Sequence, residues 1–404
     1  MASEVVEIEG HIIDSLILAK VLDIVVDAGA DYRMVDVEIG KTTLDPSRAR
    51  FEVVAADDGA LGRLLSDLRV HGVNSVAETD ATVAIAQTDG VLPAGFYATS
   101  NLPTQVRLSG RWVDVESPEM DCALVVGAEG RVRTIPMHRV RGGDQVVVGD
   151  AGVRSRPVVR ARAGSPFEFM TSEVSSEKPK DVLVARVAER IRAARTAGGK
   201  VLAVCGPAVV HTGAAPALAT LVNQGWVDVV FAGNGFATHD IEANVSGTSL
   251  GVPLSGDTPP AGGHSNHLRA INEVRRRGSI AAAVDQGWIT GGVMYECVRR
   301  GVPFVLGGSV RDDGPLPDVI TDVVEAADAM RDLLDGVSVA LMLASTLHAI
   351  ATGNLLAAGV EIYCVDINQA VVTKLADRGS RQSLGIVTDV GLFVEKLASH
   401  LALR

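Results

Sequence analysis

The sequence is poor in aromatic residues, clustered basic residues and long uninterrupted apolar segments, and these absences exclude several classes of protein. Phe, Trp and Tyr make up 4% of the 404 residues, which disfavours the base-stacking platforms of single-strand nucleic-acid binders. The formal net charge of -12 argues against general nucleic-acid binding and gives no attraction to anionic lipid. We therefore expect neither nucleic acid nor a membrane among the partners.

No pair of cysteines has CxxC spacing, and the four cysteines are scattered along the chain. This distribution is typical of buried, reduced thiols and predicts a cytoplasmic protein. The acidic N-terminus lacks the apolar core of a signal peptide. Polar residues interrupt the apolar stretch 337–365, so a buried strand, helix and strand explain that stretch better than a membrane span does.

The chain is long enough for two or three domains, and its pattern changes twice. Residues 1–105 alternate strand patterns with amphipathic helices, which predicts a small N-terminal α/β domain. Residues 106–175 hold short apolar runs between glycine turns, which predicts a β-rich antiparallel segment and a linker. Residues 176–404 repeat strand and helix with continuous apolar strands, one of them expected over 279–285. That rhythm is typical of a parallel sheet covered by helices.

Polar residues follow several of the apolar strands in residues 176–404, at the points where the strands end. They are Asn234 with Gly235, Asp313, Asp366 and Asp389. In an open parallel sheet, ligands bind just beyond the carboxyl ends of the strands. The sequence therefore predicts a nucleotide-binding crevice at this edge, although the GxGxxG fingerprint is absent.

The segment around Ser345 also lies where a buried strand passes into a helix. Ser345 and Thr346 can bind phosphate oxygens there, or they can simply cap the helix. His348 follows in the first turn, where a buried core histidine is a competing interpretation. Asp366 is placed to accept from ribose hydroxyls, and Asp389 can do the same or cap the next helix.

Two segments carry groups for acid-base chemistry. Residues 233–242 place His239, Asp240 and Glu242 directly after a buried strand, with helix capping as the alternative role for Asp240. Residues 262–267 place His264 three residues before His267. No acidic or cysteine ligand stands beside this pair, so we favour a substrate-facing role or a helix cap over zinc and predict no metal.

Long motifs resemble one family over nearly the whole chain. They include HIIDSLILAKVLD, FEFMTSEVSSEKPK, GNGFATHDIE, GGHSNHLRAIN, DQGWITGGVMYECV and LASTLHAIATGNLL. Together they resemble the NAD-dependent ornithine cyclodeaminases of archaea and cyanobacteria, also described as LOR/SDH conserved-region proteins. They are also similar to the C-terminal part of the cyanobacterial bifunctional arginine dihydrolase/ornithine cyclodeaminases. The resemblance implies a Rossmann-like domain similar to that of deoxyhypusine synthase, bound NAD, a homo-oligomer, and conversion of L-ornithine to L-proline and ammonia.

The resemblance also implies which residues contact the cofactor. These are Asn234, Gly235, Asp313, Ser345, Thr346, Leu347, His348, Asp366, Asp389 and Val390. The reaction needs a base that deprotonates an ammonium group, and the candidates are Asp240, His239 and His264. Two alternatives remain open: an NAD-dependent amino-acid dehydrogenase of the lysine or saccharopine type, and a nucleotide-sensing protein without turnover.

Overall fold

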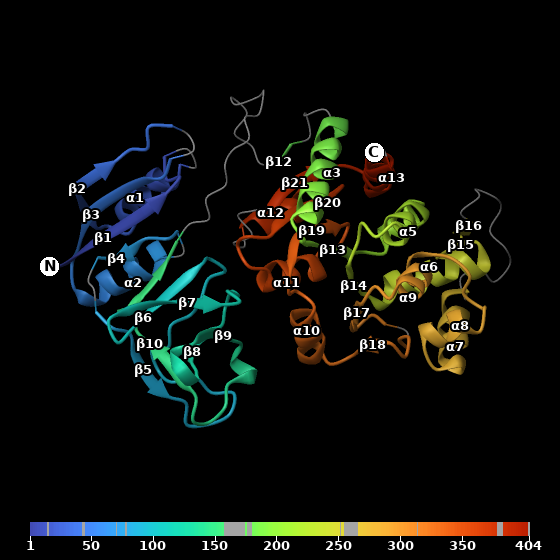
Figure 1. Ribbon diagram of the computed structural model, residues 1–404, viewed down its shortest axis with the longest axis horizontal. Helices are drawn as coiled ribbons and strands as arrows, with labels where there is room; N and C mark the ends of the chain where they lie inside the picture. Colours follow the sequence, from blue (N-terminus) through green and yellow to red (C-terminus); the bar gives the residue numbers. More distant parts are fainter. Residues whose placement is uncertain are drawn as a thin grey trace. The chain divides into compact units, whose positions relative to one another are not determined.

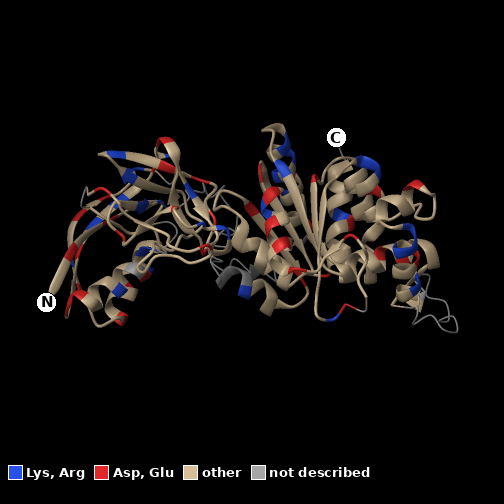
Figure 2. Ribbon diagram, turned by 90° about the horizontal axis from the view of Figure 1, so that it is seen from below, with Lys and Arg blue, Asp and Glu red and all other residues tan. Residues whose placement is uncertain are grey.

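A computed structural model describes residues 1–13, 16–42, 45–69, 71–76, 79–156, 174–175, 180–250, 252–253, 266–312, 314–377 and 383–402. The chain divides into two compact units, residues 1–171 with 354–359, and residues 172–353 with 360–404 (Figure 1). Each unit has its own buried apolar core. Acidic and basic residues are interspersed along the helices and strands of both units (Figure 2).

The first unit begins with a four-stranded sheet covered by two helices. Its strands are β1 (Ala2–Gly10), β2 (Asp31–Glu38), β3 (Ser47–Ala55) and β4 (Asn74–Ser75), in the order β2-β3-β1-β4. The helices are α1 (Ile17–Asp27) and α2 (Asp58–Arg69). Alternate residues of β3, among them Phe51 and Val53, are fully buried against these helices. The predicted N-terminal α/β arrangement is therefore present.

A seven-stranded sheet completes the first unit. Its strands are β5 (Thr82–Ile85), β6 (Thr104–Leu108), β7 (Arg111–Glu116), β8 (Ala123–Val126), β9 (Val132–Ile135), β10 (Gln145–Val148) and β11 (Val153–Ser155). The order is β11-β6-β7-β9-β8-β10-β5, with short 3-10 turns η1 (Ala128–Gly130) and η2 (Met137–Arg139). The expectation of purely antiparallel pairing is wrong for β7 and β9, which pair in parallel. β5 pairs with β10, although the sequence pattern groups it with the preceding α/β elements.

The second unit is built on an eight-stranded sheet in which every strand is parallel to its neighbours. The order is β12-β21-β20-β19-β13-β14-β17-β18. The strands are β12 (Val174–Ser175), β13 (Lys200–Cys205), β14 (Val229–Gly233), β17 (Phe304–Gly307), β18 (Val319–Ile320), β19 (Val337–Leu343), β20 (Glu361–Asp366) and β21 (Ser383–Val387).

Helices connect and cover these strands. They are α3 (Lys180–Thr196), α4 (Ala208–His211), α5 (Ala215–Asn223), α6 (Asn234–Ser246), α7 (Asn266–Arg277), α8 (Ile280–Asp285), α9 (Val293–Arg300), α10 (Val323–Asp332), α11 (Leu347–Leu355), α12 (Gln369–Asp377) and α13 (Val390–Ala402). A two-stranded ladder, β15 (Thr248–Ser249) and β16 (Val252–Pro253), follows α6. All residues of 201–205 and 339–343 are buried, because helices lie on both faces of the sheet. The predicted helix-covered parallel sheet is confirmed.

The order of the strands creates a switch point between β13 and β19. From β13 the chain moves one way through β14, β17 and β18. It then returns to pair β19 with the opposite side of β13 and continues outward through β20 and β21 (Figure 1). Connections that diverge in this way leave a crevice beyond the carboxyl ends of the two central strands.

The strand expected over residues 279–285 is wrong, because this segment forms helix α8. Ser279 caps the helix, and its side chain accepts a hydrogen bond from the backbone N–H of Ala282. Three consecutive alanines follow, and alanine has the strongest intrinsic preference for a helix. A short apolar run resembles a buried strand, and only the serine cap and the alanines indicate otherwise.

All four cysteines are buried and none forms a disulfide, as their scatter predicts. Within the described ranges, no helix combines the length and the apolar character needed to cross a bilayer.

Candidate functional site

Two loops meet at the switch point through direct contact of their backbones. The backbone N–H of Gly206 donates to the carbonyl oxygen of Leu343 at 2.9 Å. A Cβ atom on Gly206 would lie 1.8 Å from the carbonyl oxygen of Ala344. Ala344 itself has φ +47°, a left-handed conformation that alanine rarely adopts. Only glycine at position 206 permits this approach, so the close contact between the segments that follow β13 and β19 depends on it.

His348 extends from the start of α11 to the ends of the neighbouring strands β14 and β17. A Cβ on Gly233 would lie 2.8 Å from its Cε1 atom, and a Cβ on Gly307 would lie 3.0 Å from its Nε2 atom. Burial lowers the pKa of His348, and the nearby charge of Asp312 opposes that effect only in part. The imidazole is therefore neutral at neutral pH and lies over two strand ends, as expected of a residue at the rim of the sheet.

Exposed apolar side chains accompany the polar groups at this rim. Leu347 is 80% exposed at the start of α11, and Ile367 is 75% exposed directly after Asp366 at the end of β20. Thr346 is exposed and Ser345 is buried. Large apolar side chains left open beside carboxylates and hydroxyls suit a ligand that has both flat apolar rings and polar groups.

The two carboxylates at the ends of β20 and β21 differ in their hydrogen bonds. Oδ1 of Asp366 accepts from the backbone N–H of Asn368 at 2.8 Å. Its Oδ2 has no hydrogen-bond partner among the described residues, so it remains open to a hydroxyl donor. Asp389 is exposed, and its Oδ1 accepts from the N–H of Leu392 at 2.9 Å, which caps α13 next to the buried Val390. For Asp389 the structure shows the capping role that the sequence left open.

Asn234 directs its side chain into the protein. It is 5% exposed, and its Oδ1 accepts from the backbone N–H of Leu316 at 3.0 Å. The neighbouring Gly235 packs against Pro207, whose Cγ atom would lie 3.3 Å from a Cβ at that position. Asn234 thus fixes the segment after β17, and the backbone N–H groups at the start of α6 are what this position offers a ligand.

Asp240 holds the start of helix α9. Its two oxygens accept from the backbone N–H groups of Val293 at 3.0 Å and Met294 at 2.8 Å, and the residue is 1% exposed. Burial raises the pKa of Asp240 to about 6, although these two hydrogen bonds oppose the shift. A carboxylate with both oxygens engaged is poorly placed to accept a substrate proton. The helix-capping alternative therefore describes its geometry better than the role of base.

His239 pairs with a carboxylate one turn further along α6. Its Nδ1 lies 2.9 Å from Oε2 of Glu242, which is 0% exposed. The hydroxyl of Thr248 donates to Oε1 of Glu242 at 2.8 Å, and the backbone N–H of Leu250 donates to Oε2 at 3.2 Å. These donors hold the carboxylate in place, so the carboxylate in turn fixes the orientation of the imidazole.

Two further histidines surround this pair. The ring of His211, at the end of α4, lies 4.9 Å from the ring of His239, and the ring of His267 lies 6.1 Å from it on another side. Nδ1 of His211 is 2.6 Å from the hydroxyl of Ser249. Burial first, and then His239, lower the pKa of His211, while Glu242 raises it. Sequence reasoning missed His211, because only the packing of α4 on α6 brings it here.

The loop after β13 connects this histidine cluster with the strand-end rim. Gly206 contacts Ala344, and Pro207 packs on Gly235. After the short helix α4, the carbonyl oxygen of Thr212 would lie 3.1 Å from a Cβ on Gly391, which is two residues after Asp389. His211 directly precedes Thr212, so the cluster adjoins the rim of predicted cofactor contacts.

Two predicted site residues, His264 and Asp313, lie outside the described residues. Within the ranges that the structure covers, no group of three or more His, Cys, Asp or Glu side chains is arranged to hold a metal ion.

A helix-covered parallel sheet with a switch point, close backbone contact there and carboxylates beyond it defines a nucleotide-binding protein of the Rossmann type. Three family models match the chain: the LOR/SDH bifunctional enzyme conserved region over residues 3–102, the first C-terminal region of ArgZ-like arginine dihydrolase over 103–184, and its C-terminal Rossmann fold over 185–397. The chain belongs to this ArgZ-like family of ornithine cyclodeaminases, which confirms the resemblance.

Individual relatives are similar to nearly the whole of this chain. An ornithine cyclodeaminase from Methanopyrus kandleri is 51% identical over 400 residues, which cover 98% of this chain and 97% of the relative. A crystal structure of cyanobacterial ArgZ without ligand has a TM-score of 0.86 and 38% identity, covering 99% of this chain and 58% of that one. A ternary complex of AgrE with ornithine and NAD+ has a TM-score of 0.54 and 41% identity, covering 99% and 57%.

Replacing Gly206 with alanine should disrupt the crevice. The new methyl group must displace the carbonyl of Ala344, so we expect nucleotide binding to be lost and the unfolding free energy to fall by about 1–3 kcal/mol. Isothermal titration with NAD and urea denaturation measure the two effects. Gly359→Ala is the matched control, since no atom lies within 4 Å of its Cβ position. NAD binding by Gly206→Ala equal to that of the wild type would contradict this role.

Asp240 should make stability depend on pH. Its pKa rises from about 3.9 in the unfolded chain to about 6 in the folded protein. Its stabilising contribution is therefore complete below about pH 4 and is lost as pH rises through about 6. We expect the wild type to lose unfolding free energy relative to Asp240→Asn across this range in urea denaturation. The exposed Asp285→Asn serves as control. A difference between wild type and Asp240→Asn that stays constant with pH would refute the assignment.

Proposed function

We propose that this protein is an NAD-dependent ornithine cyclodeaminase that converts L-ornithine to L-proline and ammonia with recycled NAD. One observation carries the proposal: the segment 206–212 contacts the residues at the strand ends and also places His211 beside His239, which pairs with Glu242. The full-length similarity to relatives of that name supports it, as does the AgrE complex with ornithine and NAD+.

The residues at the switch point fit a nicotinamide dinucleotide. Asp366 offers an oxygen to ribose hydroxyls, and the exposed Ile367 beside it offers an apolar surface to an aromatic ring. Ser345, Thr346 and the first backbone N–H groups of α11 suit phosphate oxygens. NAD, when bound, would supply the redox chemistry by taking a hydride from the α-carbon of ornithine, which leaves an α-imine. The side-chain amine would then attack this carbon and expel ammonia to form the ring imine. Return of the hydride would give proline, so that no net NADH forms.

Among the predicted bases, we assign proton removal to His239. Nδ1 of His239 donates its hydrogen to the carboxylate of Glu242. This leaves Nε2 as the atom that takes up a proton from the substrate ammonium. The buried carboxylate also holds the ring in place for this proton transfer, since Oε2 of Glu242 lies 2.9 Å from Nδ1. Asp240 is left to position α9 against α6. For His264 a substrate-facing role remains a prediction.

The homo-oligomer and the cytoplasmic location also remain part of the proposal. The family resemblance supports the homo-oligomer, and the buried free cysteines suit a reducing compartment.

Supplying the purified protein with NAD and L-ornithine tests the reaction directly. We expect proline and ammonia in equal amounts, with no lasting rise in NADH absorbance, because the hydride is returned. The second candidate, an amino-acid dehydrogenase acting on lysine or a saccharopine-like substrate, draws support from the LOR/SDH match over residues 3–102. Accumulation of NADH with such a substrate, and no proline from ornithine, would favour that candidate.

Replacing Glu242 with glutamine tests whether Glu242 positions His239 for catalysis. The variant keeps the shape of the side chain but removes the charge beside His239, so we expect kcat to fall by roughly 100-fold. The exposed Glu189→Gln is the matched control. An unchanged kcat in a folded Glu242→Gln protein would remove His239 from the proposed role.

A further inference from the structure

Strand β1 carries Glu4 on the same face of the sheet as residues that are buried in the core. Val6 and Ile8, on the face covered by α1 and α2, are 1% and 0% exposed. Glu4 has the same parity along the strand and pairs across the ladder with Val53, which is fully buried. A charged side chain at a core-facing position costs stability unless it has a partner or a function.

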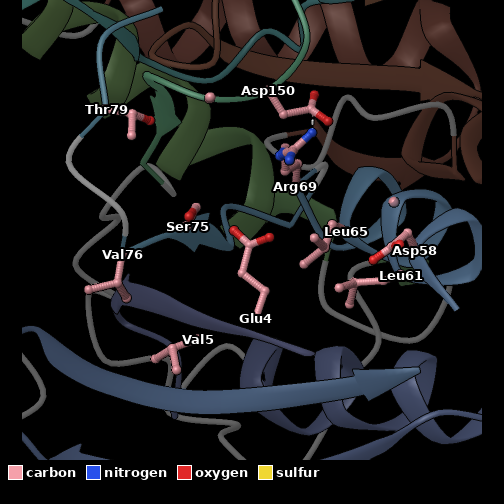
Figure 3. Close-up of a pocket in the computed structure, with 12 residues that line it drawn as sticks. Glu4, Val5, Asp58, Leu61, Leu65, Arg69, Ser75, Val76, Thr79 and Asp150 are labelled. Atoms are coloured by element: carbon pink, nitrogen blue, oxygen red, sulfur yellow. Dashed lines mark ion pairs between the residues drawn. The ribbon is translucent and has the colours of Figure 1, made fainter. Parts of the chain in front are cut away.

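The carboxylate of Glu4 points into a cavity of about 680 Å³ within the first unit (Figure 3). Leu61 and Leu65 of α2 line one wall and Ser75 of β4 another. The cavity is therefore large enough for a small molecule and has both apolar and polar walls.

The cavity has an excess of negative charge. Glu4, Asp58 and Asp150 carry three negative charges, against one positive charge on Arg69, so the net charge is -2. Asp150 forms an ion pair with Arg69, whose guanidinium side chain is only 14% exposed. In the part of the chain that the structure describes, no ion pair or hydrogen bond engages the carboxylate of Glu4 or of Asp58. Asp58 lies in the first turn of α2, where the helix dipole stabilises it. Glu4 is partly buried and interacts with the charge of Arg69 without a direct ion pair.

The guanidinium of Arg69 is held in surroundings that strengthen its interactions. Burial lowers the pKa of Arg69, while the charges of Tyr97 and Glu4 oppose that effect. Arginine has five N–H donors in a planar fork, and one carboxylate partner does not use all of them. Arg69 can therefore donate to a second carboxylate, from a ligand, and keep its ion pair with Asp150.

We propose that this cavity is a second, non-catalytic site that binds a basic amino acid with a terminal ammonium. The ammonium meets the carboxylates of Glu4 and Asp58, the methylene chain packs on Leu61 and Leu65, and the α-carboxylate meets Arg69. The ammonium of such a ligand supplies a positive charge to the cavity and forms an ion pair with Glu4. The inference is independent of the activity proposed above, since these residues lie in the first unit.

Calorimetric titration of the full-length protein with L-lysine tests the site without any turnover. We expect Glu4→Gln to weaken lysine binding at least tenfold, because the charge-assisted contact is lost while the volume is kept. Glu9→Gln is the matched control, because Glu9 is exposed on the opposite face of the same strand. It should bind within twofold of the wild type. Thermal unfolding of both variants checks that they fold.

Two further measurements define the ligand. Norvaline, which lacks the ammonium, should not bind. Replacing Arg69 with lysine should weaken lysine binding but leave binding of 1,4-diaminobutane, which has no carboxylate, within twofold. Either the absence of lysine binding to the wild type at millimolar concentration or equal binding by folded Glu4→Gln would overturn the proposal, whatever the outcome of the ornithine assay.

Discussion

The contact between Gly206 and the carbonyl of Ala344 is the constraint on which the second unit's site depends. It joins the two central strands at the point where their connections diverge, and it leaves no room for a side chain. From this contact the loop after β13 extends past Gly235 to Thr212 beside Gly391. The same short loop therefore reaches both the rim and the histidine cluster, and a change in its backbone would disturb both.

Helix α6 shows how environment gives different tasks to two carboxylates only two residues apart. Asp240 meets two backbone N–H groups and secures α9. Glu242 faces the other way, where a hydroxyl, a backbone N–H and the imidazole of His239 engage it. Both residues are almost completely buried, so burial alone does not mark a catalytic group. What distinguishes them is whether the partner is a fixed amide or a side chain that can carry a proton.

Much of the second unit could be predicted from the sequence, because its strands are continuous apolar runs that end in glycine or aspartate. Asp366 is predictable at the end of its strand for that reason, and His348 because a buried strand passes into a helix just before it. The proximity of His211 and His239 was not predictable, since it depends on how α4 packs against α6. The partner of β5 and the parallel pairing of β7 with β9 are likewise non-local. Helix α8 was missed because its apolar run is too short to show a helical period.

Hydrogen exchange with and without NAD tests most directly whether the switch point holds the nucleotide. We expect NAD to slow exchange in residues 206–212 and 344–348, because a bound dinucleotide limits the opening of both loops. Exchange in the seven-stranded sheet of the first unit, for example residues 104–116, should not change. Protection confined to the first unit, or no protection of the two loops at saturating NAD, would contradict the account.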